Sequence, residues 1–193
     1  MAPYAALPLT DAQRQTLISQ ALAARDGSHS PYSKFRVGAC LLGDDGKTFI
    51  KGANVECASY GGAICAERTA VVKGVSDGVR KFVGLAVTSD VSAMVSPCGI
   101  CRQVLREFCP LEMPVLLVPA SYVEGKTRSI AAAEAEHGST QDTLVETTMG
   151  ELLPLSFGPD DLAKPRPGFD MGLSESGTLA PASETDLDAT AAA

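Results

Sequence analysis

Two short motifs that contain three cysteines and one glutamate constrain this chain more than any other feature of its sequence. The first motif is C-A-E at residues 65–67, and the second is P-C-G-I-C at residues 97–101. Three thiolates can fill three corners of a tetrahedral zinc site and leave the fourth corner for water, as catalytic zinc sites do. Glu67 lies two positions after a ligand, so its carboxylate can reach that water without binding the metal. The spacing therefore predicts a catalytic zinc site with Cys65, Cys98 and Cys101 as ligands.

Three thiolates around one Zn²⁺ leave an excess of negative charge, which weakens the pull of the metal on its water. Both motifs place cysteines at predicted helix N-termini, where unpaired N–H groups and the helix dipole stabilise thiolates. Arg68 directly follows Glu67, and Arg102 directly follows Cys101. We expect Arg68 to donate a hydrogen bond to a ligating sulfur, with Arg102 as the alternative donor.

A structural zinc site is the alternative interpretation of the two motifs. It would need a fourth sulfur, from Cys57, Cys109 or Cys40, and it leaves Glu67 and its spacing unexplained. Cys40 stands in an apolar stretch and Cys109 at the end of a predicted helix. Both positions are typical of small buried side chains rather than of ligands.

Composition narrows the class of protein. The chain has 193 residues, of which 45% are hydrophobic, and its net charge is −7. This length supports one domain with a sizeable core. The negative charge disfavours a long nucleic-acid footprint and favours a small-molecule substrate. No apolar run approaches the roughly 20 residues of a membrane helix, and the N-terminus does not resemble a signal peptide, so a cytoplasmic location is expected.

The order of the expected elements indicates an α/β fold with a mixed sheet. Thr10 precedes an amphipathic helix that Gly27 stops, and the turn at 43–46 joins two strands into an antiparallel hairpin. We expect the remaining elements in this order: helix 63–74, strand 82–88, helix 98–108, strand 115–118, a return to the sheet edge at 144–145, and short helices ending at 154 and starting at 159.

We expect one domain over residues 1–163, followed by a tail. The stretch 120–143 has little apolar periodicity and is interpreted as a surface insertion, with a helical turn at 130–136. From 164 to 193 the chain is rich in Pro, Gly, Ser, Thr, Ala and acidic residues and has few large apolar side chains. Such a composition predicts disorder.

Several segments together resemble the small homotetrameric cytidine deaminases. The resemblance covers about residues 10–163, and its segments follow the same order as in that family. The matching segments are PYSKFRVGA at 31–39, NVE at 54–56, CAERTA at 65–70, SPCGICRQV at 96–104, ELLP at 151–154 and FGPDDL at 157–162.

The resemblance implies a three-layer αβα fold around a five-stranded mixed sheet, assembled as a homotetramer with shared active sites. It implies Zn²⁺ on the three motif cysteines, with Glu67 as the proton shuttle. The implied activity is hydrolytic deamination of cytidine and deoxycytidine to uridine, deoxyuridine and ammonia, in pyrimidine salvage.

The resemblance also implies which residues bind the nucleoside. Asn54 and Glu56 would hold the ribose 3′-hydroxyl, and their side chains point the same way because an extended chain repeats every two residues. Phe35 would pack on the pyrimidine. The remaining implied contacts are the backbone N–H of Ala66 to the base O2, with Tyr60 and Phe157 completing the pocket of a neighbouring subunit.

Some residues depart from the family pattern and leave other substrates open. Cys57 stands where the family commonly has Asn, and Gly61-Gly62 before the first motif resembles blasticidin-type deaminases. The alternative function is therefore deamination of a related aminopyrimidine nucleoside such as blasticidin S. Polynucleotide editing is disfavoured by the negative charge, and neither nucleic acid nor a membrane is an expected partner.

Overall fold

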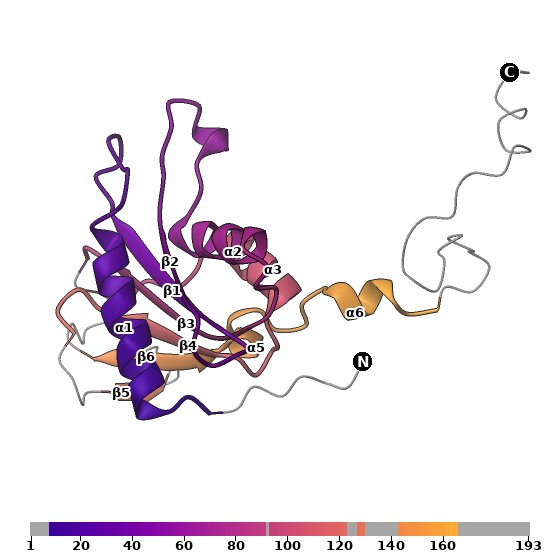
Figure 1. Ribbon diagram of the computed structural model, residues 1–193. Helices are drawn as coiled ribbons and strands as arrows, with labels where there is room; N and C mark the ends of the chain where they lie inside the picture. Colours follow the sequence, from indigo (N-terminus) through magenta and orange to yellow (C-terminus); the bar gives the residue numbers. More distant parts are fainter. Residues whose placement is uncertain (1–7, 92, 123–126, 130–142, 166–193) are drawn as a thin grey trace, which may run out of the picture. The chain divides into compact units, whose positions relative to one another are not determined.

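The computed structural model describes residues 8–91, 93–122, 127–129 and 143–165 (Figure 1). The chain divides into two compact units, residues 1–158 and 159–193. In the second unit the described secondary structure is α6 (Pro159–Leu162). The helical turn expected at 130–136 and nearly all of the expected tail lie outside the described residues, so the domain boundary at 163 stays a prediction.

A mixed sheet forms the centre of the first unit, as predicted. Its order is β2-β1-β3-β4-β6-β5, in which β3–β4 and β5–β6 are parallel and the other pairs antiparallel. The five predicted strands are present, and the three-residue β5, inside the expected insertion, pairs outside β6. The strands are β1 (Val37–Gly43), β2 (Phe49–Ala53), β3 (Phe82–Ser89), β4 (Pro114–Val118), β5 (Thr127–Ser129) and β6 (Leu144–Thr148).

Helices cover both faces of the sheet, which confirms the predicted αβα architecture (Figure 1). On one face lies α1 (Asp11–Arg25), which begins at Thr10 with the expected cap, because the Gln13 N–H donates to the Thr10 hydroxyl. On the other face α2 (Ala66–Ser76) and α3 (Gly99–Phe108) lie side by side, and α5 (Met149–Leu152) follows β6. No helix of the described residues is long and apolar enough to cross a membrane.

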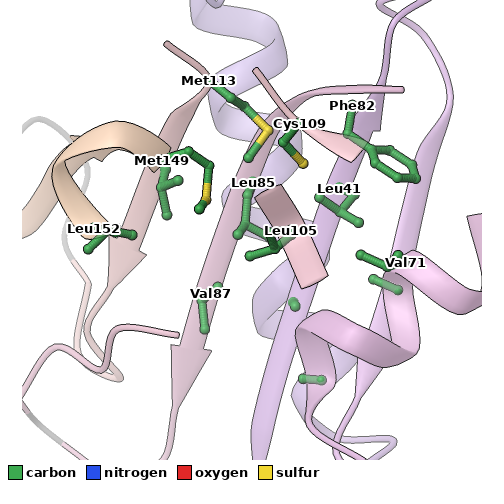
Figure 2. Packing of buried hydrophobic residues seen from close by; sticks show 14 of the residues in the cluster. Leu41, Val71, Phe82, Leu85, Val87, Leu105, Cys109, Met113, Met149 and Leu152 are labelled. Atoms are coloured by element: carbon green, nitrogen blue, oxygen red, sulfur yellow. The ribbon is translucent and has the colours of Figure 1, made fainter. Parts of the chain in front are cut away.

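Alternating strand residues build one core on each face. On the α1 face, Cys40, Leu42 and Ala86 pack with Leu17 and Ile18. On the opposite face, strand residues pack with residues of α2, α3 and α5 (Figure 2). The residues labelled there are Leu41, Val71, Phe82, Leu85, Val87, Leu105, Cys109, Met113, Met149 and Leu152.

Strand register brings three chain segments to one end of the sheet. Gly38 at the start of β1 pairs with Ala53 at the end of β2, and Val37 pairs with Ser89 at the end of β3. The chain runs from these strand ends into α2 and α3 through the loops at 54–65 and 90–98. The N-termini of both helices are therefore reached from the same end of the sheet.

A glycine sets how closely α2 approaches the sheet. A Cβ at Gly52 would lie 2.2 Å from the carbonyl oxygen of Ala66 and 2.5 Å from the amide nitrogen of Ala70. The backbone of β2 therefore packs directly on the backbone of α2, and helix backbone cannot shift as a flexible side chain can. This contact fixes the first turn of α2 above β2.

We expect Gly52→Ala to lower the free energy of unfolding by about 3 kcal/mol, because the new methyl group must push α2 away from β2. Urea unfolding at fixed protein concentration measures the change. Gly61→Ala is the matched control, since a Cβ there has no atom within 4 Å. Equal stability of the two variants would contradict the close packing described here.

Candidate metal centre

Two helix N-termini bring three cysteine sulfurs together. Cys65 is the N-cap residue of α2, Cys98 is the N-cap residue of α3, and Cys101 lies in the first turn of α3. The Sγ atoms of Cys65 and Cys98 are 3.9 Å apart, and those of Cys98 and Cys101 are 3.5 Å apart. All three lie within 4.8 Å of one another. The expectation that the motif cysteines stand at helix starts is confirmed.

The spacing of the sulfurs fits a zinc ion. Zn–S bonds of about 2.3 Å in a tetrahedron place the sulfurs about 3.8 Å apart. Within the described part of the chain, these three cysteines are the group whose atoms could jointly hold a metal. Cys40 faces α1 and Cys109 is buried in the other core, while the Cys57 sulfur donates to the carbonyl of Ser59 at 2.8 Å. The cluster therefore offers three protein ligands, which leaves one position of a tetrahedron open.

Arg68 supplies positive charge to the cluster. Its Nη2 donates to the Cys65 sulfur at 3.5 Å. The pKa of Cys65 is lowered to about 5, first by a hydrogen bond from the Cys101 thiol and then by Arg68. The pKa of Cys101 is raised in turn, because it shares that hydrogen bond with Cys65 and is buried. Cys65 is thus the member of this pair that loses its proton more readily.

Arg102, the alternative donor, has a different role. Its guanidinium donates to the Pro97 carbonyl at 2.6 Å, the Ser96 hydroxyl at 2.8 Å and the Leu152 carbonyl at 2.7 Å. It therefore ties the loop before Cys98 to the end of α5. Sequence reasoning missed this contact, because Leu152 is distant in the sequence and nothing local to Arg102 points to it.

Glu67 is a buried carboxyl beside the sulfurs. It is 4% exposed and lies in the first turn of α2. Burial raises its pKa above the ordinary range for Glu, and the negative charge of Cys65 adds to the rise. A raised pKa makes a carboxyl better able both to accept and to release a proton during a reaction.

The two residues expected to hold a sugar hydroxyl organise the segment 28–37. The Asn54 side-chain oxygen accepts from the Val37 N–H at 2.8 Å and the Ser28 hydroxyl at 2.6 Å, and its amide donates to the Phe35 carbonyl at 2.8 Å. Glu56 accepts hydrogen bonds from the turn at 32–33. No local sequence pattern predicts these contacts, and the sugar-binding role of both residues stays a prediction.

The expected aromatic residues lie at or near the surface. Tyr60, in the short 3₁₀ turn η1 (Tyr60–Gly62), is 73% exposed and packs edge-on against Tyr32, with ring centroids 5.8 Å apart. Phe157 is 58% exposed, and its carbonyl accepts from Gln103 at 3.0 Å. Phe35 is half-buried, and Ala66 is the buried first residue of α2.

A pocket of about 270 Å³ opens beside these residues. Its lining combines aromatic rings with one carboxylate, which suits a ligand that has both an apolar face and hydroxyl groups. The lining residues are Tyr32, Ser33, Glu56, Tyr60 and Ala63.

Known proteins with the same features are cytidine deaminases. The family model of the cytidine and deoxycytidylate deaminase zinc-binding region matches residues 11–117, which include the three cysteines and Glu67. The cytidine deaminase of Halalkalibacterium halodurans is 44% identical over 149 residues, which are 77% of this chain and 97% of that protein.

Solved structures agree with the sequence comparison. The crystal structure of the Burkholderia pseudomallei cytidine deaminase has a TM-score of 0.60 and 36% identity, covering 74% of this chain and 98% of that chain. The Mycobacterium tuberculosis cytidine deaminase has a TM-score of 0.58 and 32% identity, covering 77% and 98%. Together with the three-cysteine cluster, the zinc-binding family model identifies the cofactor as a zinc ion.

We expect X-ray absorption at the zinc edge of the loaded protein to show three sulfur ligands and one lighter ligand, because the cluster holds three thiols. Cys98→Ala should lower both the sulfur number and the zinc content. Cys57→Ala is the control and should leave both unchanged. Four sulfurs in the unmodified protein would support the structural zinc site instead.

Proposed function

The chain belongs to the cytidine and deoxycytidylate deaminase family, and on that premise we propose that it hydrolyses cytidine and deoxycytidine to uridine and deoxyuridine with release of ammonia. The observation that carries this proposal is the pairing of a three-sulfur cluster with a buried carboxyl, Glu67, whose pKa is raised. A zinc site with an open position and a proton carrier beside it is suited to hydrolysis.

The zinc ion, when bound, supplies a Lewis acid that lowers the pKa of a water molecule. Glu67 accepts a proton from the water that adds to C4 of the base and delivers it to N3. It then carries a proton to the amino group that leaves C4 as ammonia. Its burial supports this role, because a carboxyl shielded from solvent exchanges its proton with the substrate rather than with bulk water.

Arg68 limits how far the negative sulfurs reduce the ability of the metal to polarise water. A guanidinium that donates to the Cys65 thiolate withdraws charge from it, and the N-termini of α2 and α3 act in the same direction. We therefore assign to Arg68 the role of adjusting the Lewis acidity of the metal. This role needs no contact between Arg68 and the substrate.

The nucleoside is held by the residues around the pocket. Glu56 accepts a hydrogen bond from a hydroxyl of the sugar. Asn54 donates a hydrogen bond to the same hydroxyl, since one of its amide hydrogens is left after its three contacts. Phe35 packs against the base. The first helical N–H groups of α2 lack a side-chain cap at Cys65, which leaves the Ala66 N–H available for the base O2.

Assembly and location complete the proposal. The exposed rings of Tyr60 and Phe157 support a homotetramer in which each copy contributes to a neighbour's pocket, because aromatic side chains are enriched at protein interfaces. Tyr60 also lines the pocket of its own chain, so in this arrangement it would lie between two copies. All six cysteines are free thiols, which supports a reducing compartment such as the cytoplasm. There the activity would serve pyrimidine salvage.

Purified protein should convert cytidine to uridine, measured as loss of cytidine absorbance. Glu67→Gln should keep its zinc and its fold but lose at least about 100-fold in kcat, because the proton carrier is gone. Glu107→Gln, an exposed residue of α3, is the matched control and should keep full activity. Unchanged kcat in the Glu67 variant would refute its role.

The same assay separates the candidate substrates. Cytosine and a cytidine nucleotide test whether the sugar and its unmodified 5′ end are needed, and blasticidin S tests the alternative function. Preference for blasticidin S over cytidine would overturn the proposed substrate but not the proposed chemistry.

Arg68→Gln should retain zinc and lose roughly tenfold or more in kcat, because a hydrogen bond to a charged sulfur is lost. Arg80→Gln provides a matched control, since Arg80 is exposed. Zinc content and kcat are measured on the same preparations. Wild-type kcat in the Arg68 variant would argue that the N-termini of the two helices suffice.

A further inference from the structure

We infer that Ser33 is a positioning residue that aims the Glu56 carboxylate at a hydroxyl of the substrate's sugar. The inference rests on the proposed function and deepens it, because it identifies what sets the sugar selectivity of that site. It comes from how the turn at 30–35 is built and from what that turn does to one carboxylate.

Three donors of the turn bind Glu56. One carboxylate oxygen, Oε2, accepts from the backbone N–H groups of Tyr32 at 3.1 Å and Ser33 at 3.2 Å. The other, Oε1, accepts from the Ser33 hydroxyl. These bonds hold the pKa of Glu56 below its ordinary range, and the hydrogen bond from the Ser33 hydroxyl contributes most. The group is therefore a carboxylate at neutral pH.

The count of acceptor sites shows what remains for a ligand. An ionised carboxylate has about four lone-pair sites, two on each oxygen. Both sites of Oε2 and one site of Oε1 are used by Tyr32 and Ser33. One site on Oε1 is left, and its direction is set by the hydroxyl that occupies the other site. Ser33 therefore decides where Glu56 can accept a further hydrogen bond.

The turn that carries Ser33 is itself fixed. The Ser33 hydroxyl oxygen accepts from the Phe35 N–H at 3.0 Å, and the Lys34 N–H donates to the Ser30 carbonyl at 3.1 Å. Lys34 has φ 58°, the left-handed region that non-glycine residues seldom adopt. A conformation of this cost persists only where surrounding bonds hold it. The Ser33 hydroxyl thus links the carboxylate to the backbone of the aromatic residue expected to face the base.

The remaining acceptor site belongs to a pocket. Ser33 and Glu56 both line the 270 Å³ pocket, together with the rings of Tyr32 and Tyr60. A hydroxyl of a sugar is the group that suits one carboxylate acceptor in a pocket that is also lined by two aromatic rings. Loss of the Ser33 hydroxyl would free Oε1 to turn, so the cost should fall on binding of that hydroxyl and spare the chemical step.

Kinetics of Ser33→Ala test the inference, with uridine and 3′-deoxyuridine as competitive inhibitors of cytidine turnover. We expect the KM for cytidine and the Ki of uridine to rise about tenfold, with kcat within twofold of wild type. The Ki of 3′-deoxyuridine should change less than twofold, because this compound lacks the hydroxyl that donates a hydrogen bond to Glu56. Ser33→Thr keeps a hydroxyl and should restore wild-type values, and Ser59→Ala, an exposed residue of the neighbouring loop, should not differ from wild type.

Each other outcome overturns the inference. An equal rise in Ki for both inhibitors would mean that Ser33 acts only through the general shape of the turn. Unchanged constants in Ser33→Ala would mean that the two backbone N–H groups position Glu56 alone. Wild-type protein that fails to deaminate cytidine would overturn the proposed function together with this inference, so the two failures are distinguishable.

Discussion

The meeting of two helix N-termini over one end of the sheet is the constraint on which the site depends. Cys65 caps α2 and Cys98 caps α3, so the metal ligands are placed by the backbones of two packed helices rather than by loops. The close approach of Gly52 to the first turn of α2 fixes one of these helices. Rigid helix starts hold the sulfurs at a spacing that suits zinc.

The negative charge of three cysteine ligands explains why the site also needs positively charged groups. Three thiolates repel one another, and the hydrogen bond between Cys65 and Cys101 lowers the pKa of the Cys65 thiol and raises that of the Cys101 thiol. Arg68 and the two helix dipoles offset part of the remaining negative charge. Burial and then the negative charge of Cys65 raise the pKa of Glu67, while Arg68 acts in the opposite direction. Metal binding and proton transfer therefore depend on one shared balance of charge.

Local patterns were enough to predict the strands, the helices and the cysteines at the helix starts, because each depends on neighbours in sequence. The contacts that the sequence did not reveal are long-range. Arg102 binds Leu152, and Glu56 accepts from Ser33, through pairings that form only once the chain has folded. β6 was expected at the sheet edge, and the short β5, which has no apolar periodicity around it, pairs outside it. Strand order and side-chain partners of this kind are set by tertiary packing.

The cysteines of the cluster differ in exposure, so that one ligand faces solvent and another is buried. Cys101 is 0% exposed, whereas Cys98, on the same helix turn, is exposed. In the single chain, a competing ligand or an arriving metal ion can reach the Cys98 sulfur first and the Cys101 sulfur last. We expect metal exchange to begin at the exposed Cys98 and to end at the buried Cys101, so retention of the metal is a question of rate as well as of affinity.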